Sequence, residues 1–473
     1  MKIKKYIVLG LVLAFININI LPVFAITDKN SKNEDKQQLK KEKMLQHKVK
    51  RGKNYNDNYK YDYVNLDFWK AFNDENLNNY INLAIKNNHD LKMATLNVDE
   101  FYQATKIQFA NELPQATLGF SPAYAKMPQK DADWMFAFPM IINYEADIFL
   151  KNRDKTKSAK KLYEGSKDDE RAAYISIASA VGAVYFNIVK LNDMISTQEE
   201  IVDLRKQIYD IMLISNKEGL VSTSDTVKAN KSYIAGSSQL IEFKKEREKL
   251  LHKLAVLIGD TPENINNYKF TKLSEINYSK EIPTEISSEI IVNRPDYLKS
   301  EKMLEKYGID VRVAKKEFLP TINLSGLALF MSQAGGSGLF NTRNGIYALA
   351  AAAMMPVFTG GKRIANLKLK KVQYDKMLES YHKTNLTAIQ EVNDALVTVK
   401  RDSEKLDEHK RQLKLETEDF GYTQQRYDAG IISKLDLAQM KENLLTVNQM
   451  VANMTADCYV DYISLYKATG SKL

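Results

Sequence analysis

Two short stretches of the chain share one pattern, Gly219-Leu-Val-Ser-Thr-Ser-Asp225 and Gly430-Ile-Ile-Ser-Lys-Leu-Asp436, and they start 211 positions apart. Each stretch has a glycine, two apolar residues and a serine three positions before an aspartate. Glycine readily adopts the left-handed conformation that ends a helix, and Ser-x-x-Asp resembles the capping box that begins the next one. The pattern therefore predicts two helix hairpins that turn at corresponding points of the chain.

The scarcity of proline predicts that the helices of these hairpins are long. The chain has 10 prolines among 473 residues, and none lies at 140–261 or 357–473. A proline inside a helix costs about 3 kcal/mol, so both stretches can be continuous helix. Apolar residues of the first stretch follow a heptad seam, at Ile177, Val181, Val184, Ile188, Leu191 and Ile195. The second stretch keeps this register from Ile389 to Phe420, although three of its seam positions are polar.

Further pairs of similar residues recur at a nearly constant offset of 206 to 211 positions. The pairs are Leu113-Pro114 with Leu319-Pro320, Phe149 with Phe358, and Leu257-Ile-Gly259 with Ala468-Thr-Gly470. Matches in this order indicate a tandem duplication. We expect a first repeat at 61–265, a linker at 266–285 and a second repeat at 286–473.

Short segments with alternating apolar residues precede each helical stretch. They are Thr117–Ala125 and Trp134–Tyr144 in the first half, and Ile322–Phe330 and Ile346–Ala353 in the second. Period-two alternation predicts strands, and each pair is expected to form a hairpin. The aromatic residues suit the lipid face of an outer-membrane barrel, at Trp134, Phe136, Phe138, Tyr144, Phe330 and Tyr347. The alternative is an ordinary buried sheet face. Four strands cannot close a barrel, whereas three chains would supply twelve.

The first 25 residues have the features of a secretory signal peptide. Lys2, Lys4 and Lys5 precede an apolar stretch, and Val23-Phe24-Ala25 is a suitable cleavage site. A membrane anchor is the alternative, but the apolar stretch is too short and too interrupted to span a bilayer. Residue 26 is isoleucine rather than the cysteine that lipidation requires, so we expect no lipid anchor. Residues 26–60 are polar and are expected to be flexible.

Composition argues against an enzyme. The chain has one cysteine, Cys458, and five histidines, and it lacks the H-E-x-x-H, P-loop and G-x-G-x-x-G motifs. We therefore expect no catalytic residue, no metal and no cofactor. The net charge of +9 comes from lysines interleaved with acidic residues on expected helix faces, which argues against nucleic acid as a partner.

A set of short motifs, taken in order, resembles the TolC-type outer-membrane efflux proteins from about Asp67 to Gly470. The motifs are Asp67-Phe-Trp69, Asn88-His-Asp-Leu91, Tyr144-Glu-Ala-Asp-Ile-Phe149, Ile291-Val-Asn-Arg-Pro-Asp296, Pro356-Val-Phe-Thr-Gly-Gly-Lys-Arg363, Glu391-Val392 and Arg426-Tyr427. The resemblance implies a mainly α fold with a small β part. It also implies a homotrimer in outer-membrane lipid, with a twelve-stranded barrel that continues into a helical tunnel across the periplasm. Its expected partners are a periplasmic adaptor and an inner-membrane pump of the RND or ABC type.

The resemblance assigns roles to the two turns. An adaptor-docking tip is expected at Gly219, Leu220, Val221, Ser222, Gly430, Ile431, Ile432 and Ser433, with the apolar residues exposed. A periplasmic gate is expected at Asp225, Tyr427 and Asp436. The alternative is that all of these residues only cap helices. Arg294-Pro295-Asp296 is expected to begin a helix and to have a structural role.

The function that follows is a passive exit duct of a tripartite efflux or type I secretion system. The alternative is a periplasmic coiled-coil scaffold that does not conduct. The strand segments favour the duct, because a scaffold has no need for paired strands with an aromatic face.

Overall fold

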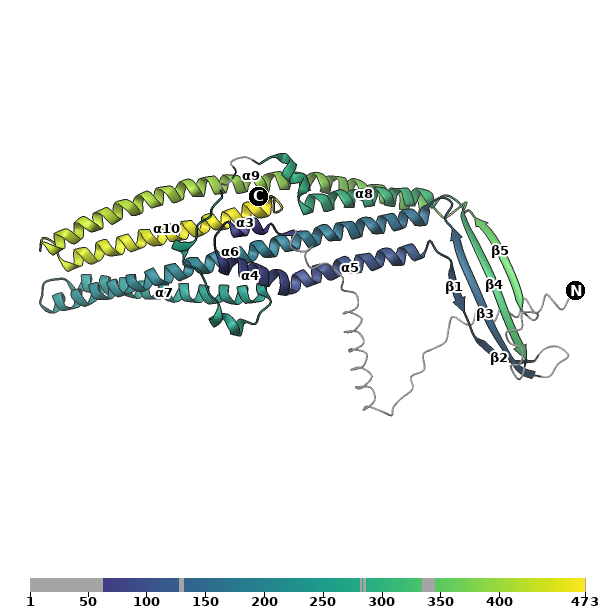
Figure 1. The fold of residues 1–473 in the computed structure, drawn as a ribbon, viewed down its shortest axis with the longest axis horizontal. Coiled ribbons are helices and arrows are strands. Elements are labelled where there is room, and N and C mark those ends of the chain that lie inside the picture. The colour runs from purple at the N-terminus through teal and green to yellow at the C-terminus, as the bar shows by residue number, and fades with distance from the viewer. Residues whose placement is uncertain (1–62, 127–131, 281–282, 284–285, 334–344, 473) are drawn as a thin grey trace. The chain divides into compact units, whose positions relative to one another are not determined.

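Two helices of equal length set the frame of the fold (Figure 1). In this computed structural model α6 (Lys151–Lys217) and α9 (Lys362–Asp428) have 67 residues each, which corresponds to about 100 Å at 1.5 Å per residue. The structure describes residues 63–126, 132–280, 283, 286–333 and 345–472, all within the unit Lys60–Leu473. The expected signal peptide and the polar segment 26–60 lie outside the described residues.

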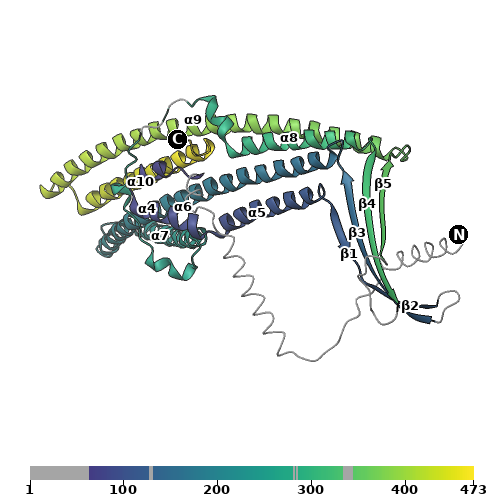
Figure 2. The ribbon, with the colours of Figure 1, turned by 45° about the vertical axis from the view of Figure 1, so that its right-hand side comes forward.

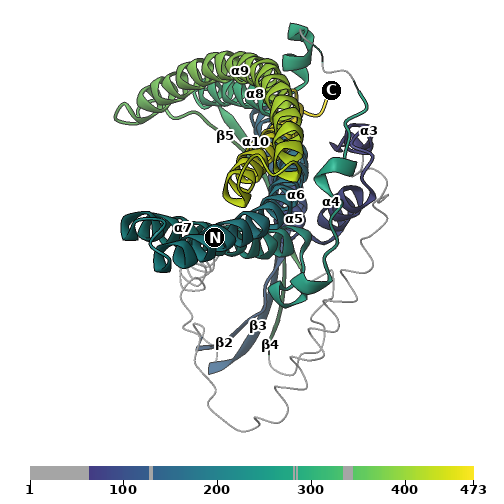
Figure 3. The same cartoon turned by 90° about the vertical axis from the view of Figure 1, so that its left-hand side faces the viewer.

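The long helices each fold back into a shorter one, as the two turn motifs predict. Helix α6 is followed by α7 (Thr223–Ile258), and α9 by α10 (Lys434–Ala468). In the half nearer the sheet, α5 (His89–Ala110) and α8 (Pro295–Lys316) flank α6. Figures 1 and 2 show α5 and α7 end to end, and α8 and α10 likewise. Figure 3 shows that these helices form a curved layer, with α9 along one edge and α5 and α7 along the other.

The strands form one antiparallel sheet at the end of the helical layer. It comprises β1 (Gln115–Leu118), β2 (Ser121–Lys126), β3 (Ala132–Ala146), β4 (Thr321–Gln333) and β5 (Ile346–Met354). Strands β1 and β2 pair with β3, β3 pairs with β4, and β4 pairs with β5. Both expected hairpins are thus present, and a β3–β4 pairing joins them. The helical fold with a small antiparallel sheet confirms the predicted fold class.

The expected first strand, Thr117–Ala125, is divided into β1 and β2, so the four predicted strands form five segments. Leu118 pairs with Met140 and Ser121 pairs with Ala137, so the register continues across the gap. Pro139 lies opposite the gap and has no N–H to donate to the ladder. Only the N–H of Gly119 bonds across, to the carbonyl oxygen of Pro139 at 2.8 Å. We treat β1 and β2 as one interrupted strand.

The main core lies where two short helices cover α6. Helices α3 (Leu66–Lys70) and α4 (Glu75–Asn87) bring Trp69 and Phe72 against Phe186 and Tyr466. Leu273 of the expected linker 266–285 is also buried there, because the 3₁₀ turns η2 (Pro262–Asn267) and η3 (Leu273–Glu275) fold back onto the layer. Residues 266–280 of the expected linker are therefore part of the packed structure.

The middle of the predicted apolar seam of α6 is buried, whereas Ile177 and Ile195 at its ends are half-buried. Val181, Val184, Ile188 and Leu191 are all at most 8% exposed. Among the described helices, α6 alone contains an apolar stretch of membrane-spanning length, and 61% of that stretch is buried by protein. In α9 the seam is thinner, since Val392, Val399 and Leu406 are buried but Ile389 is 39% exposed. The order of strands, long helix, turn and short helix occurs in both halves, and the tandem duplication remains a prediction.

Candidate functional site

The two hairpin turns have nearly the same backbone geometry. Gly219 has φ +72° and Gly430 has φ +69°, the left-handed conformation expected at a helix end. The N–H of Leu220 bonds to the carbonyl of Ser215 at 2.8 Å, and that of Ile431 to the carbonyl of Arg426 at 2.9 Å. An added Cβ would meet no heavy atom within 4 Å at either glycine. The glycines are therefore required by backbone conformation and not by close packing.

Each returning helix begins at the expected serine. Ser222 Oγ accepts the N–H of Asp225 at 3.1 Å, and Ser433 Oγ accepts that of Asp436 at 3.2 Å. The second turn completes the capping box, because Asp436 Oδ2 accepts the N–H of Ser433 at 3.0 Å. In the first turn Asp225 instead binds Lys228 Nζ at 2.9 Å. Hydrogen bonds from Lys228 and from Ser433 lower the pKa of Asp225 and of Asp436 respectively, so both carboxylates stay ionised near neutral pH.

The apolar surface of the turns is narrower than expected. Leu220 is 77% exposed and Ile431 is 67% exposed. Val221 and Ile432 are half-buried. The expectation of four exposed apolar residues is therefore corrected to one prominent residue per turn. Tyr427 is half-buried in the last turn of α9, and no hydrogen bond joins its hydroxyl to Asp225 or Asp436 among the described residues.

A polar bridge joins the two hairpins between the turns and the core. Arg205 of α6 donates from Nε to Glu442 Oε1 of α10 at 2.8 Å, and from Nη1 to the carbonyl of Ser232 on α7 at 3.1 Å. Two turns away, Gln449 of α10 donates to Gln198 Oε1 of α6 at 3.2 Å. Toward the turns the hairpins diverge (Figures 1 and 3). Among the hydrogen bonds and ion pairs of the described residues, the Arg205–Glu442 contact is the one between the hairpins that lies nearest their free ends.

Sequence reasoning missed this bridge, although a signal was present. Gln198 and Arg205 continue the heptad seam that ends in Leu191 and Ile195, with the same spacing of three and four. A charged residue on an apolar seam needs a partner, because burial of an unpaired charge is costly. Its partner Glu442 lies 237 positions away, and the sequence gives no indication of that pairing.

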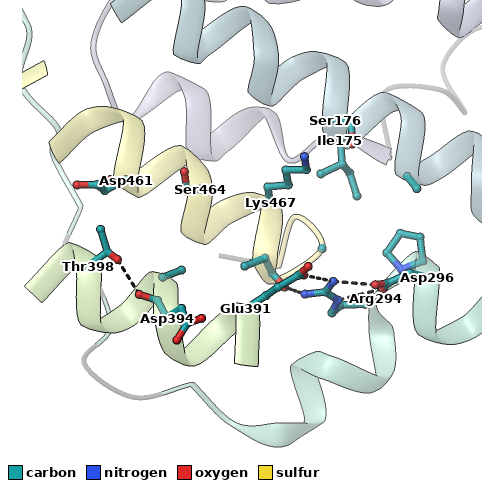
Figure 4. Close-up of a pocket in the computed structure, with 15 residues that line it drawn as sticks. Ile175, Ser176, Arg294, Asp296, Glu391, Asp394, Thr398, Asp461, Ser464 and Lys467 are labelled. Carbon is teal, nitrogen blue, oxygen red and sulfur yellow. Dashed lines mark hydrogen bonds and ion pairs between the residues drawn. The ribbon is translucent and has the colours of Figure 1, made fainter. Parts of the chain in front are cut away.

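A second kind of contact joins helices end to end at the middle of the layer. Arg294 Nη1 donates to the carbonyl of Ala468, the last residue of α10, at 2.7 Å, and its other nitrogens bind Asp296 and Glu391. Asn88 Nδ2 donates to the carbonyl of Leu257 near the end of α7 at 2.8 Å. Figure 4 shows Arg294 between the two carboxylates. Arg294-Pro295-Asp296 therefore begins α8, as predicted, and binds α10 to it.

Comparison with known proteins identifies this architecture. Residues 80–260 and 286–471 match the family model described as outer membrane efflux protein. The chain belongs to the outer membrane efflux protein family. It is 25% identical over 414 residues to the toluene efflux pump outer membrane protein TtgC of Pseudomonas putida, which covers 85% of this chain and 84% of that one. It is 24% identical to the probable outer membrane lipoprotein SilC of Salmonella typhimurium, over 86% and 88% of the two chains.

A solved structure agrees with the family assignment. The Campylobacter jejuni CmeC outer membrane channel superposes with a TM-score of 0.78 at 26% identity, over 86% of this chain and 88% of that one. This outer membrane efflux protein is therefore similar to a channel over nearly its whole described length. The similarity, together with the family match, supports a transport role.

The sheet of this outer membrane efflux protein has an aromatic face. All six aromatic residues expected in the barrel lie on the same face, because the strand register places their cross-strand partners together. Trp134 and Tyr347 are 51% and 57% exposed, while Phe138 lies opposite Phe330. The other face carries polar residues of β3 and β4, including Asn143 and Ser325, which are hydrogen bonded at 3.2 Å. The sheet thus has one apolar side and one more polar side.

A cavity of about 610 Å³ lies beside Arg294, between α6, α8, α9 and α10 (Figure 4). Asp461 of α10 lines it, and its Oδ2 is buried without a hydrogen-bond partner. Its carboxyl group contacts that of Asp402 on α9, so the two helices share an acid pair. Burial and the Asp402 charge raise the pKa of Asp461 to about 7. No group of side chains in the described part of the chain could hold a metal ion.

Proposed function

We propose that three copies of this chain form an exit duct through the outer membrane, with no reaction and no cofactor of their own. The observation that carries this proposal is that both edges of the described unit are open. In the sheet, β5 pairs only with β4, and β1 and β2 pair only with β3. Lipid offers no hydrogen bonds to an open strand edge, so a membrane sheet of this kind must close on further copies.

The edges of the helical layer carry exposed apolar side chains. Along α9 they include Leu369, Val372, Leu386, Val397 and Leu415, each at least 52% exposed. Along the opposite edge they include Leu96 and Ile107 of α5 and Ile234 and Ile241 of α7, each at least 58% exposed. Different surfaces on the two edges favour head-to-tail association, which closes into a ring. An apolar edge needs a cover, and a second copy offers one along the whole layer.

The number of copies follows from the space that a barrel encloses. Two copies would supply about eight strands, whose interior is filled by side chains. Three copies supply about twelve and leave an aqueous path. The aromatic face would lie against lipid and the face with Asn143 and Ser325 would line the path. We place the sheet in the outer membrane and predict that it anchors the chain without a lipid group at Ile26.

The free ends of the hairpins are the proposed contact with other components. Leu220 and Ile431 are exposed at the end of the helical layer farthest from the sheet, where no membrane covers them. We propose that they bind a periplasmic adaptor, which connects the duct to an inner-membrane pump. We propose Asp225, Tyr427 and Asp436 as gate residues, since the two carboxylates remain charged at the narrow end.

The test combines assembly and conductance. We expect the purified chain to give a trimer by light scattering in mild detergent and to conduct ions in planar bilayers. Leu386→Glu on α9 or Leu96→Glu on α5 should prevent assembly, because each places a charge in the buried contact between copies. Met450→Glu is the control, since Met450 is also 45% exposed but lies on α10, which packs between α6 and α9 inside the layer. A monomer without conductance would overturn the duct and favour the scaffold.

A further inference from the structure

Basic residues are concentrated where the helices meet the sheet. The segments 151–161 of α6, 312–316 of α8 and 362–371 of α9 contain 14 lysines and arginines and one acidic residue, Asp154. The whole chain has 68 basic and 59 acidic residues. The part outside these segments therefore has slightly more acidic than basic residues. We call this set the basic belt, and it comprises Lys151, Arg153, Lys155, Lys157, Lys160, Lys161, Arg312, Lys315, Lys316, Lys362, Arg363, Lys368, Lys370 and Lys371.

The belt lies at one level of the molecule. Its three segments are the sheet-facing ends of α6, α8 and α9, which lie side by side next to the strands (Figures 1 and 2). The other ends of α6 and α9, near the two hairpin turns, mix both signs of charge. The basic residues therefore form a band across the layer and not a stripe along one helix.

Only part of this charge is neutralised within the protein. Asp154 is buried and binds Lys316 at 2.7 Å, with Arg312 at 3.6 Å. Lys151 pairs with Glu145 at 2.7 Å. The exposed members without an acidic partner among the described residues are Arg153, Lys160, Lys315, Lys362, Lys368 and Lys371. The belt thus presents an uncompensated positive surface.

The linkers between the belt and the sheet indicate what covers that surface. Ile148 and Phe149 join β3 to α6 and are 63% and 38% exposed. Val357 and Phe358 join β5 to α9 and are 94% and 88% exposed. Going from sheet to helices, the surface is therefore apolar on the strands, apolar on the linkers and then basic. This order matches the order of acyl chains and headgroups in a bilayer leaflet.

We propose that the basic belt binds the phosphate groups of anionic phospholipids in the leaflet that meets the helical end of the sheet. The proposal rests on the membrane position of the sheet in the proposed function. Lysine and arginine near an anionic lipid surface each contribute favourable energy that falls with salt. The belt would fix the depth of the sheet in the membrane and orient the helical layer away from it.

The test measures lipid selectivity of the full chain in vesicles of equal parts phosphatidylcholine and phosphatidylglycerol. Spin-labelled lipid of each class reports the fraction that is motionally restricted by the protein. The belt variant combines Lys160→Gln, Lys315→Gln, Lys368→Gln and Lys371→Gln. The control variant removes four exposed lysines far from the sheet, with Lys206→Gln, Lys217→Gln, Lys405→Gln and Lys414→Gln.

We expect the wild type and the control variant to prefer phosphatidylglycerol by about threefold or more, and the belt variant to lose most of this preference. Added sodium chloride should weaken the preference, and inorganic phosphate at the same ionic strength should weaken it no further. Stronger competition by phosphate would show a site for soluble anions and overturn the lipid assignment. Two double variants should each lose part of the preference for phosphatidylglycerol. One combines Lys160→Gln with Lys315→Gln, and the other combines Lys368→Gln with Lys371→Gln.

The experiment distinguishes a failure of the lipid proposal from a failure of the proposed membrane position. A chain that enters the bilayer and restricts both lipids equally would overturn the belt while leaving the duct intact. A chain that restricts neither lipid and does not associate with the vesicles would overturn both the membrane position of the sheet and the lipid binding of the belt.

Discussion

The guanidinium of Arg294 donates a hydrogen bond of 2.7 Å to the carbonyl oxygen of Ala468, 174 residues away. The last carbonyls of a helix have no partner within the helix, and this contact satisfies one of them. Asn88 makes the equivalent contact to Leu257 in the other half at 2.8 Å. These contacts join α8 to α10, and α5 to α7, end to end across the middle of the layer.

Glycines make these end-to-end contacts possible, which gives a first prediction. A Cβ on Gly259 would lie 2.7 Å from the carbonyl oxygen of Asn87, whereas a Cβ on Gly219 would meet nothing within 4 Å. Both glycines have φ +72°, so the backbone strain of alanine is the same at each. We expect Gly219→Ala to lower the free energy of unfolding by about 1 kcal/mol and Gly259→Ala by about 2–4 kcal/mol.

Chemical denaturation of both variants in mild detergent measures this difference. Gly421→Ala, two turns before the end of α9 and with open space around its Cβ, is the control and should be neutral or slightly stabilising. If both variants lose the same free energy of unfolding, the close approach of Gly259 to Asn87 does not contribute to stability.

The acid pair of α9 and α10 gives a prediction on pH. Burial and the Asp402 charge raise the pKa of Asp461 from 3.8 to about 7. The folded chain therefore holds a proton that the unfolded chain releases, and the free energy of unfolding falls as the pH rises from about 4 to about 7. Asp461→Asn should raise that free energy by about 1–2 kcal/mol at about pH 8 and leave it unchanged near pH 4.

An aspartate outside this acid pair is a matched control with the opposite sign. Asp310 binds Lys306 at 2.9 Å, so Asp310→Asn should lower stability at about pH 8 through loss of an ion pair. Thermal unfolding of both variants across this pH range is the measurement. If the difference in unfolding free energy between the wild type and Asp461→Asn does not change with pH, the folded chain does not hold the extra proton on Asp461.

The bridge between the hairpins gives a third prediction. Arg205 and Glu442 are about one-quarter exposed and are joined at 2.8 Å. Glu442→Arg should place two like charges together and let the hairpins separate, and Arg205→Glu in the same chain should restore the contact. Spin labels at Leu220 and Ile431, in a Cys458→Ser background, would report a broader distance distribution for the single variant and recovery for the exchange. Glu408→Arg, beside Arg411, whose side chain is 72% exposed, is the control and should change nothing.

Much of the fold follows from local sequence. The positions of the turns follow from Gly219 and Gly430, because a left-handed residue before a serine cap has few alternatives. The helix lengths follow from the absence of proline, and the strands from period-two alternation. The division of the first strand depends on Pro139 opposite Gly119, a cross-strand relation that alternation within one strand does not contain.

The candidate sites were less predictable. The capping serines and aspartates are local and were predicted, whereas the partner of Arg205 lies 237 residues away and that of Asp461 lies on another helix. Exposure at the turns was only partly predictable, since Val221 and Ile432 are half-buried while Leu220 and Ile431 are exposed. Both residues of each pair are apolar, so the sequence does not distinguish them.

The second turn gives a prediction that separates adaptor binding from helix capping. Gly430 has φ +69° and no atom within 4 Å of an added Cβ, so Gly430→Val should cost about 1–2 kcal/mol through the backbone alone. The loss should be local, because α9 and α10 also pack through Leu406, Met454 and Cys458. We expect the variant to assemble but to lose adaptor binding and export. Gly421→Val, inside α9 and without a positive φ, should keep both, and export by Gly430→Val would exclude the docking role of this turn.

The last prediction concerns Asp436, whose carboxylate both caps α10 and carries a charge at the exposed second turn. Its Oδ2 accepts the N–H of Ser433 at 3.0 Å, and the Ser433 hydroxyl bond lowers its pKa. Asp436→Asn keeps an acceptor for the cap and removes the charge, whereas Asp436→Lys removes the cap and reverses the charge. If the residue attracts cations, single-channel cation selectivity should fall in Asp436→Asn and fall further in Asp436→Lys, with adaptor binding intact. If it only caps the helix, Asp436→Asn should match the wild type in selectivity and only Asp436→Lys should lose stability, by about 1 kcal/mol.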